Sequence, residues 1–182
     1  MYVNIRKRFV ILFTLLFVLS ASFVYADGGD GSGDGDGQGN GLNRNIPLTL
    51  KSSSVADGAT DVAVNETIQL SFNKNICNIT VLSNNRTCFH LTDEAGEAVS
   101  IKLIFPDTQV QKDYRREVFI KPAEDLDPNT SYEIAVDSTL IAKNGMTLDN
   151  AHVFSFTTGT SPMDKENAIL EKLGENVITY ET

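Results

Sequence analysis

Tryptophan is absent from the chain, and only two His, two Cys and three Met occur among its 182 residues. Most metal centres need several His, Cys or Met ligands, and sugar-binding platforms need exposed aromatic rings. The composition therefore speaks against most metal chemistry and implies no cofactor. A carbohydrate-binding accessory module is an alternative, but scattered Tyr side chains are the only aromatic residues with a polar group that could form its sugar-binding platform.

Basic residues are also scarce, with 15 Lys and Arg against 24 Asp and Glu, a formal net charge of −9 at pH 7. Nucleic-acid binding needs clustered positive side chains, so this composition argues against nucleic acid as a partner. The length allows one domain of ordinary size, and 41% hydrophobic residues are enough for one packed core.

Catalytic motifs are missing as well. The sequence has no GxSxG, HExxH, P-loop or GxGxxG pattern that would open a helix. Glu124, Asp125 and Asp127 lie close together, and a solvated loop explains them better than an acid/base pair. The sequence therefore predicts a protein without enzymatic activity.

The N-terminus is typical of a secretory signal peptide. Arg6, Lys7 and Arg8 precede an uncharged apolar run, and small residues suit cleavage after Ala26. An uncleaved membrane anchor is the alternative, since residues 9–26 carry no charge. Removal of residues 1–26 would leave 12 basic and 24 acidic side chains, a net charge of −12.

Residues 27–45 predict a flexible linker. Between residues 27 and 41 the chain has eight Gly and four Asp and no apolar side chain, so nothing there can be buried. Part of the run approximates the order of a calcium loop: Asp34, Asp36, Gln38 and Gly39. An EF-hand needs Glu where this chain has Asn45, and weak calcium association remains the alternative.

Residues 46–160 show the period-two alternation of β-strands, with turn residues between short apolar runs and no amphipathic helix. Strands with one apolar face pair most economically as two packed sheets. We therefore expect an all-β, Ig-like antiparallel β-sandwich. Its seven predicted strands are residues 46–53, 67–72, 88–92, 99–104, 118–121, 131–136 and 153–158.

A tyrosine corner is predicted just before the sixth of these strands. Leu126, Pro128 and Tyr132 follow the spacing of this motif. In Ig-like sandwiches the Tyr hydroxyl bonds to backbone a few residues upstream and fixes the crossing between sheets. A half-buried strand aromatic is the simpler alternative for Tyr132.

Four runs carry a family resemblance: 54–74 (SVADGATDVAVNETIQLSFNK), 91–96 (LTDEAG), 126–132 (LDPNTSY) and 154–159 (FSFTTG). In this order they resemble a bacterial Ig-like domain of the SbsA type, over about residues 46–160. The resemblance implies a non-catalytic extracellular module, found in S-layer and other surface proteins, often as a spacer or in tandem arrays. This chain departs from that pattern in its single copy, its lack of a recognisable wall-anchoring domain and its inserted cysteine pair.

Cys77 and Cys88 are the only cysteines of a chain predicted to be exported, so we expect a disulfide between them. Closing this loop would stabilise the fold by about 3 kcal/mol. A metal site or a reactive thiol is the alternative, but His90 stands alone beside Cys88.

Two surface features are candidates for binding. In residues 107–117, Tyr114, Arg115 and Arg116 gather in an otherwise acidic protein. They suit an acidic polymer or a carbohydrate, although a solvated hairpin loop is the simpler interpretation.

The second feature is the tail, residues 161–182. A short helix is predicted between Ser161 and Gly174. Its apolar stripe consists of Met163, Ile169, Leu170 and Leu173. So short a helix must pack on its own sandwich or on a partner or neighbouring copy. Residues 177–180 form a possible edge strand, which invites pairing with another chain.

Together these features predict a secreted, non-catalytic module on the extracellular side of a bacterial envelope. Its expected partner is another extracellular or cell-envelope protein or polymer, with membrane contact only if the signal segment is uncleaved. The alternative is a self-associating subunit of an extracellular assembly, joined by pairing of an edge strand or of the C-terminal segment.

Overall fold

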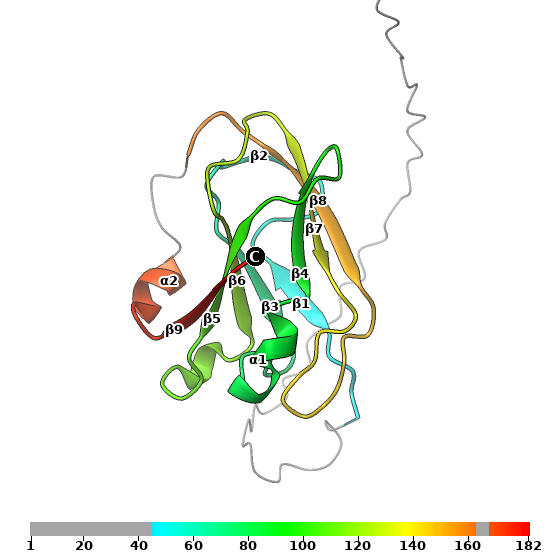
Figure 1. Cartoon of the computed structure of the whole chain (residues 1–182), viewed down its shortest axis with the longest axis vertical. Coiled ribbons are helices and arrows are strands. Elements are labelled where there is room, and N and C mark those ends of the chain that lie inside the picture. The colour runs from blue at the N-terminus through cyan, green and yellow to red at the C-terminus, as the bar shows by residue number, and fades with distance from the viewer. Residues whose placement is uncertain (1–44, 163–167) are drawn as a thin grey trace, which may run out of the picture. The chain divides into compact units, whose positions relative to one another are not determined.

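The computed structural model describes residues 45–162 and 168–182. The predicted signal peptide, the predicted linker up to residue 44 with its calcium-like run, and Met163 lie outside these residues. Two β-sheets enclose a hydrophobic core to which both contribute (Figure 1). This arrangement confirms the predicted all-β sandwich.

The larger sheet has five antiparallel strands in the order β1-β3-β6-β5-β9. Alternation works as predicted in β3, where Ile68, Leu70 and Phe72 are buried and the residues between them are half-exposed. The bounds of the strands are β1 (Leu50–Ser53), β3 (Ile68–Phe72), β5 (Ile101–Pro106), β6 (Glu117–Pro122) and β9 (Val177–Glu181).

The smaller sheet has four strands in the order β2-β8-β7-β4. Its first pair, β2 with β8, is parallel, and β2 is the strand in residues 45–162 that the sequence prediction missed. This short strand has only one buried side chain, Val62, which is too little for an alternation signal. The bounds are β2 (Ala59–Val62), β4 (Phe89–Asp93), β7 (Ser131–Val136) and β8 (His152–Thr158).

A short helix that the sequence analysis did not identify interrupts the sandwich, although it is not amphipathic. Helix α1 (Ile79–Asn85) lies between β3 and β4, and its N-cap Asn78 accepts a hydrogen bond from the Thr80 N–H at 3.2 Å. Only Leu82 and Asn85 of the helix are buried. One apolar side chain is too few to reveal a helical period.

Two further short helices lie in the features expected to bind. The 3₁₀ helix η2 (Lys112–Tyr114) occupies the β5–β6 connection. Helix α2 (Ala168–Leu173) precedes β9 and ends at Gly174, the predicted stop, whose φ is +55°. The Gly174 N–H donates to the Leu170 carbonyl at 3.1 Å.

Candidate interaction surface

The outer face of the five-stranded sheet carries a small apolar cluster, separate from the main core. Ile104 of β5 and Phe119 of β6 lie opposite each other on this face. Leu173 of α2 covers them and is 1% exposed. The tail helix therefore packs on its own sandwich, which was one of its two expected positions.

Tyr114 of η2 packs against the same cluster, so the structure brings together two features that are far apart in the sequence. Lys172 Nζ lies 5.5 Å from the centre of the Tyr114 ring. A hydrogen bond to the Tyr114 side chain raises the pKa of Lys172. The β5–β6 connection and α2 therefore form one surface, which we call the outer patch: Tyr114, Ile169, Leu170, Lys172 and Leu173.

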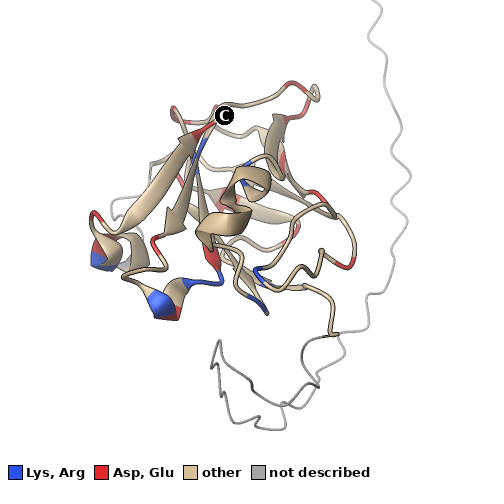
Figure 2. Ribbon diagram, turned by 60° about the horizontal axis from the view of Figure 1, so that its bottom comes forward, with Lys and Arg blue, Asp and Glu red and all other residues tan. Residues whose placement is uncertain are grey.

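Arg115 and Arg116 lie next to this patch and are half-buried. The Arg115 carbonyl accepts from the Ile76 N–H at 3.1 Å, and the Arg116 carbonyl accepts from the Phe72 N–H at 3.0 Å. These bonds hold the two arginines at the end of the sandwich where α1 lies. Figure 2 turns this end forward and shows blue Lys and Arg segments on η2 and the chain beside it.

A shallow hollow of about 350 Å³ lies between α2 and the sheet. Its lining is mostly apolar and consists of Ile104, Leu170, Glu171, Gly174 and Val177.

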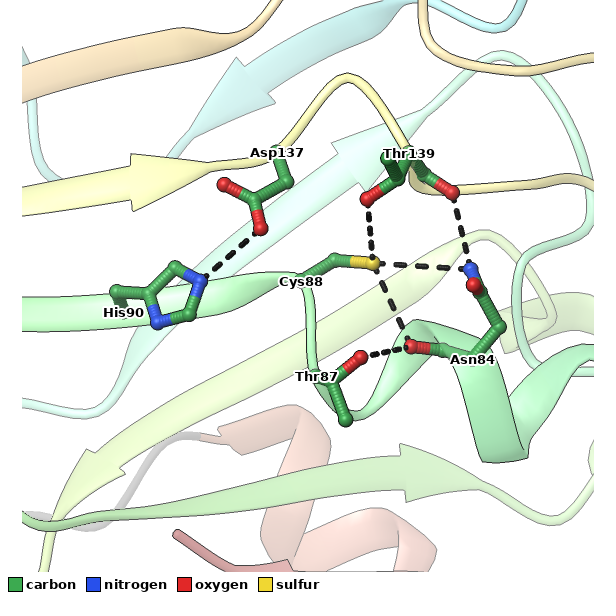
Figure 3. Close-up of polar contacts among 6 residues, drawn as sticks. All are labelled: Asn84, Thr87, Cys88, His90, Asp137 and Thr139. Atoms are coloured by element: carbon green, nitrogen blue, oxygen red, sulfur yellow. Dashed lines mark hydrogen bonds and ion pairs between the residues drawn. The ribbon is translucent and has the colours of Figure 1, made fainter.

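The predicted disulfide is not formed, because Cys77 and Cys88 are both free thiols. Cys77 Sγ donates to the Glu117 carbonyl of β6 at 3.0 Å. Cys88 Sγ donates to the Asn84 carbonyl at 3.4 Å and lies 3.6 Å from the Thr139 hydroxyl (Figure 3). Helix α1 separates the two cysteines in sequence, and their sulfurs contact different parts of the fold.

Burial raises the pKa of both thiols, that of Cys77 well above its ordinary value. Protonated, buried thiols are poor nucleophiles. His90 does not activate Cys88, because its Nε2 instead lies 3.1 Å from the Asp137 carboxylate (Figure 3). In the described part of the chain, no group of three His, Cys, Asp or Glu side chains could hold a metal ion.

Asn85 is a structural residue that the sequence reasoning missed. It is fully buried, and its Nδ2 donates to the carbonyls of Ile76 at 2.8 Å and Ile141 at 2.9 Å. Its Oδ1 accepts from the Ile141 N–H at 3.1 Å. The side chain thereby joins α1 to the chain before the helix and to the β7–β8 connection, and its position in an Asn-Asn pair gives no hint of this.

The residues of the predicted tyrosine corner lie where the chain crosses from β6 in one sheet to β7 in the other. The Tyr132 hydroxyl accepts from the Asp127 N–H at 2.9 Å, which is the bond that the motif requires. Tyr132 is 5% exposed and stacks on Phe156, with ring centres 5.8 Å apart. Leu126 is buried, and Pro128 lies exposed in the turn.

Thr158 completes this crossing. Its hydroxyl donates to the Asp127 carbonyl at 2.6 Å and accepts from the Thr130 N–H at 3.0 Å. Both backbone groups of Asp127 are therefore bonded by side chains of the smaller sheet. These bonds fix the backbone of the crossing at Asp127 to both β7 and β8.

No helix in the described residues is long and apolar enough to cross a membrane. The sequence model of the family described as "Bacterial Ig-like domain" matches residues 44–158, which is more than half of the chain. Comparison with curated proteins gives no match.

Three solved structures are similar to the chain. Surface layer protein SbsC, domains 1–6, has 12% identity and a TM-score of 0.44 over 63% of this chain and 14% of its own. CopC from Methylosinus trichosporium OB3b has 14% identity and a TM-score of 0.41, and the match covers 66% of this chain and 99% of CopC. An L,D-transpeptidase from Mycobacterium smegmatis has 17% identity and a TM-score of 0.38, and the match covers 63% of this chain and 41% of the transpeptidase.

Proposed function

Because the chain belongs to the bacterial Ig-like domain family, we propose that it is a secreted, non-catalytic module of the SbsA type. It acts at the bacterial cell surface or outside the cell, where it binds a protein or polymer of the envelope. The N-terminal signal-like segment supports export, and the Gly/Asp-rich linker gives the domain reach.

The observation that carries the proposal is the meeting of the η2 loop and α2 on the outer face of the five-stranded sheet. Aromatic and Arg side chains are the residue types most enriched at protein interfaces. Here Tyr114 lies in the same surface as α2, with Arg115 and Arg116 beside it. The η2 loop joins the adjacent strands β5 and β6, so the sheet itself positions Tyr114, Arg115 and Arg116.

Charge indicates the kind of partner. Over most of its surface an acidic chain is repelled by anionic envelope polymers. A locally basic site such as Arg115 and Arg116 orients the module toward such a partner, and mainly sets the rate and salt dependence of association. We therefore expect binding to an anionic wall polymer, or to an acidic surface of an envelope protein, that weakens as salt is added.

The test is co-sedimentation of the purified chain with isolated bacterial cell walls at low and at high salt. The variant Arg115→Gln/Arg116→Gln should bind about tenfold more weakly at low salt. The control Lys51→Gln/Lys121→Gln removes two positive charges from β1 and β6 and should bind as the unchanged chain does.

Circular dichroism and the melting temperature verify that both variants are folded. Equal binding by the two folded double variants would place the site elsewhere. No binding of the unchanged chain at any salt concentration would contradict the wall as partner.

A further inference from the structure

The C-terminal segment, residues 168–182, lies outside the part of the chain that the family model matches, which ends at residue 158. Its strand β9 occupies the edge of the five-stranded sheet beside β5 (Figure 1). Without β9, the backbone edge of β5 would be open. The segment therefore fills a strand-addition site on the domain, which we call the β5 seat.

The β5 seat is specific for this sequence. Ile178 and Tyr180 are partly buried and pack against the main core, and the Tyr180 ring lies 6.1 Å from Phe105, edge to face. Arg86 of the α1 end lies 5.1 Å from the centre of the Tyr180 ring. On the other face, Val177 joins the cluster under α2. The segment thus contacts both faces of the sheet through alternate residues.

The backbone register is equally defined. Ile101 and Thr182 exchange two hydrogen bonds, at 3.1 and 3.3 Å, and the Asp107 N–H donates to the Asn176 carbonyl at 2.9 Å. Hydrogen-bonded and non-hydrogen-bonded pairs alternate in antiparallel strands. Lys102 and Glu181 are therefore a non-hydrogen-bonded pair, whose side chains lie close together, with Nζ and Oε1 3.6 Å apart.

The segment nevertheless buries fewer side chains than the central strands do. No side chain of β9 is fully buried, whereas four of the six in β6 are. In α2 and β9, Leu173 is the one fully buried side chain among those described. Elements with few buried contacts open more readily than the core.

We propose that two copies of this chain exchange these segments, so that residues 168–182 of one copy fill the β5 seat of the other. The occupant is a second copy because the contacts of the seat match this sequence residue by residue. The closed monomer dominates at low concentration, since its own segment is tethered nearby. The paired form gains population as concentration rises.

The inference names a second copy of this chain as a partner of the proposed interaction module, and in that respect it rests on the proposed function. Wall binding and segment exchange are measured separately, so either can fail without the other.

Two variants of the full chain test the exchange. One carries Lys102→Cys and the other Glu181→Cys, which places thiols at facing positions of β5 and β9 and removes only an exposed ion pair of small energy. The two proteins are mixed, concentrated and treated with oxidised glutathione. Each inter-chain disulfide that forms converts one oxidised glutathione into two reduced molecules.

Two controls accompany the mixture. A single chain carrying both substitutions should close within itself, which shows that the pair can form. A mixture of the Glu181→Cys chain with a Lys51→Cys chain places the second thiol on β1, at the opposite edge of the sheet. Peptide mass analysis assigns each bridge and separates it from bridges to Cys77 or Cys88.

Exchange predicts a bridge between positions 102 and 181 of different chains, in excess of the Lys51→Cys control. While dimers are the minority, a tenfold rise in concentration should raise the cross-linked share about tenfold. Closure of the doubly substituted chain together with no excess inter-chain bridge would overturn the proposal. Dimers in sedimentation that lack the 102–181 bridge would overturn it too.

Discussion

The main core and the C-terminal segment are built from the same residue types but are held very differently. In the main core both sheets contribute fully buried side chains, among them Leu70, Ile134 and Phe156. Polar side chains bond the backbone where the chain crosses between the sheets, as Tyr132 and Thr158 do. The C-terminal segment has one comparably buried side chain among those described, Leu173.

The difference teaches that sheet membership alone does not measure how firmly a strand is held. Strand β9 pairs with β5 over five residue pairs, more than the four that join β5 and β6. Its side chains, however, are half-buried or exposed. Net backbone hydrogen-bond energies are modest, so apolar burial decides which strand can be released.

The largest expected contrast comes from two buried leucines. Leu70→Ala removes side-chain volume from the main core and should lower the free energy of unfolding by about 3 to 4 kcal/mol. Leu173→Ala should lower it by about 1 to 2 kcal/mol, because its loss is limited to the energy that docks the segment. Denaturant unfolding of both variants measures the difference.

A second result would support this comparison. In Leu173→Ala, amide hydrogen exchange should accelerate in residues 168–182 and remain slow in β3 and β6. Equal losses of stability, with exchange accelerated throughout, would mean that the segment and the main core unfold as one unit.

Thiol reactivity gives a second contrast. Cys77 and Cys88 are buried in the main core, so a thiol reagent should reach them only through global opening. A thiol introduced by Leu173→Cys should react through opening of the segment alone, about 100-fold faster or more. Labelling rates of the native protein measure both.

The same reagent checks the state of the cysteines. Unfolded in denaturant without reductant, the unchanged chain should expose two thiols, as the structure has them. If no thiol reacts under these conditions, the free thiols of the structure are contradicted. The result would then support the disulfide that the sequence predicts for an exported chain.

Most strands could be predicted because each has an apolar face that sequence alternation reveals. In β7, for example, Tyr132, Ile134 and Val136 are buried and the residues between them are not. Strand β2 and helix α1 could not be predicted, because each buries only one apolar side chain, Val62 and Leu82. The spacing of apolar residues does not reveal an element that is held mainly by backbone pairing, as β2 is, or by a buried amide, as α1 is.

The candidate surface was only partly predictable. Its members were selected as two separate features, since nothing in the sequence shows that Tyr114 and Leu173 share one cluster. That contact depends on β9 returning beside β5, which places α2 over Phe119. The disulfide was predicted from the cysteine count and the expected export, and neither shows that Cys77 Sγ bonds to the β6 backbone and Cys88 Sγ to the Asn84 carbonyl.

The tyrosine corner gives a smaller test. Tyr132→Phe leaves the Asp127 N–H without its acceptor and should cost about 1 to 2 kcal/mol of unfolding free energy. Tyr180→Phe is the matched control in the C-terminal segment, where the ring makes the aromatic and cation contacts. It should change stability by about 0.5 kcal/mol or less. Comparable losses in thermal unfolding would argue against a special role for the Tyr132 hydroxyl.

The smallest expected effect tests whether every side chain of the main sandwich stabilises the fold. Glu66 lies half-buried in the connection before β3, and burial raises its pKa above the ordinary 4.5. As pH rises from 4.5 through the folded-state pKa, the unfolded chain releases this proton first, so the folded state loses stability. The loss persists at pH 7, where Glu66 is charged in both states.

Glu66→Gln keeps the side chain neutral and removes this loss. The variant should match the unchanged chain below pH 4 and exceed it at pH 7 by about 0.5 kcal/mol or less, since solvent screens a half-exposed group. Glu94→Gln, in an exposed turn, controls for loss of one negative charge from the acidic chain. Melting temperatures of all three proteins across this pH range provide the measurement. A gain at pH 7 that persists unchanged below pH 4 would show that side-chain packing, not burial of the charge, causes the difference.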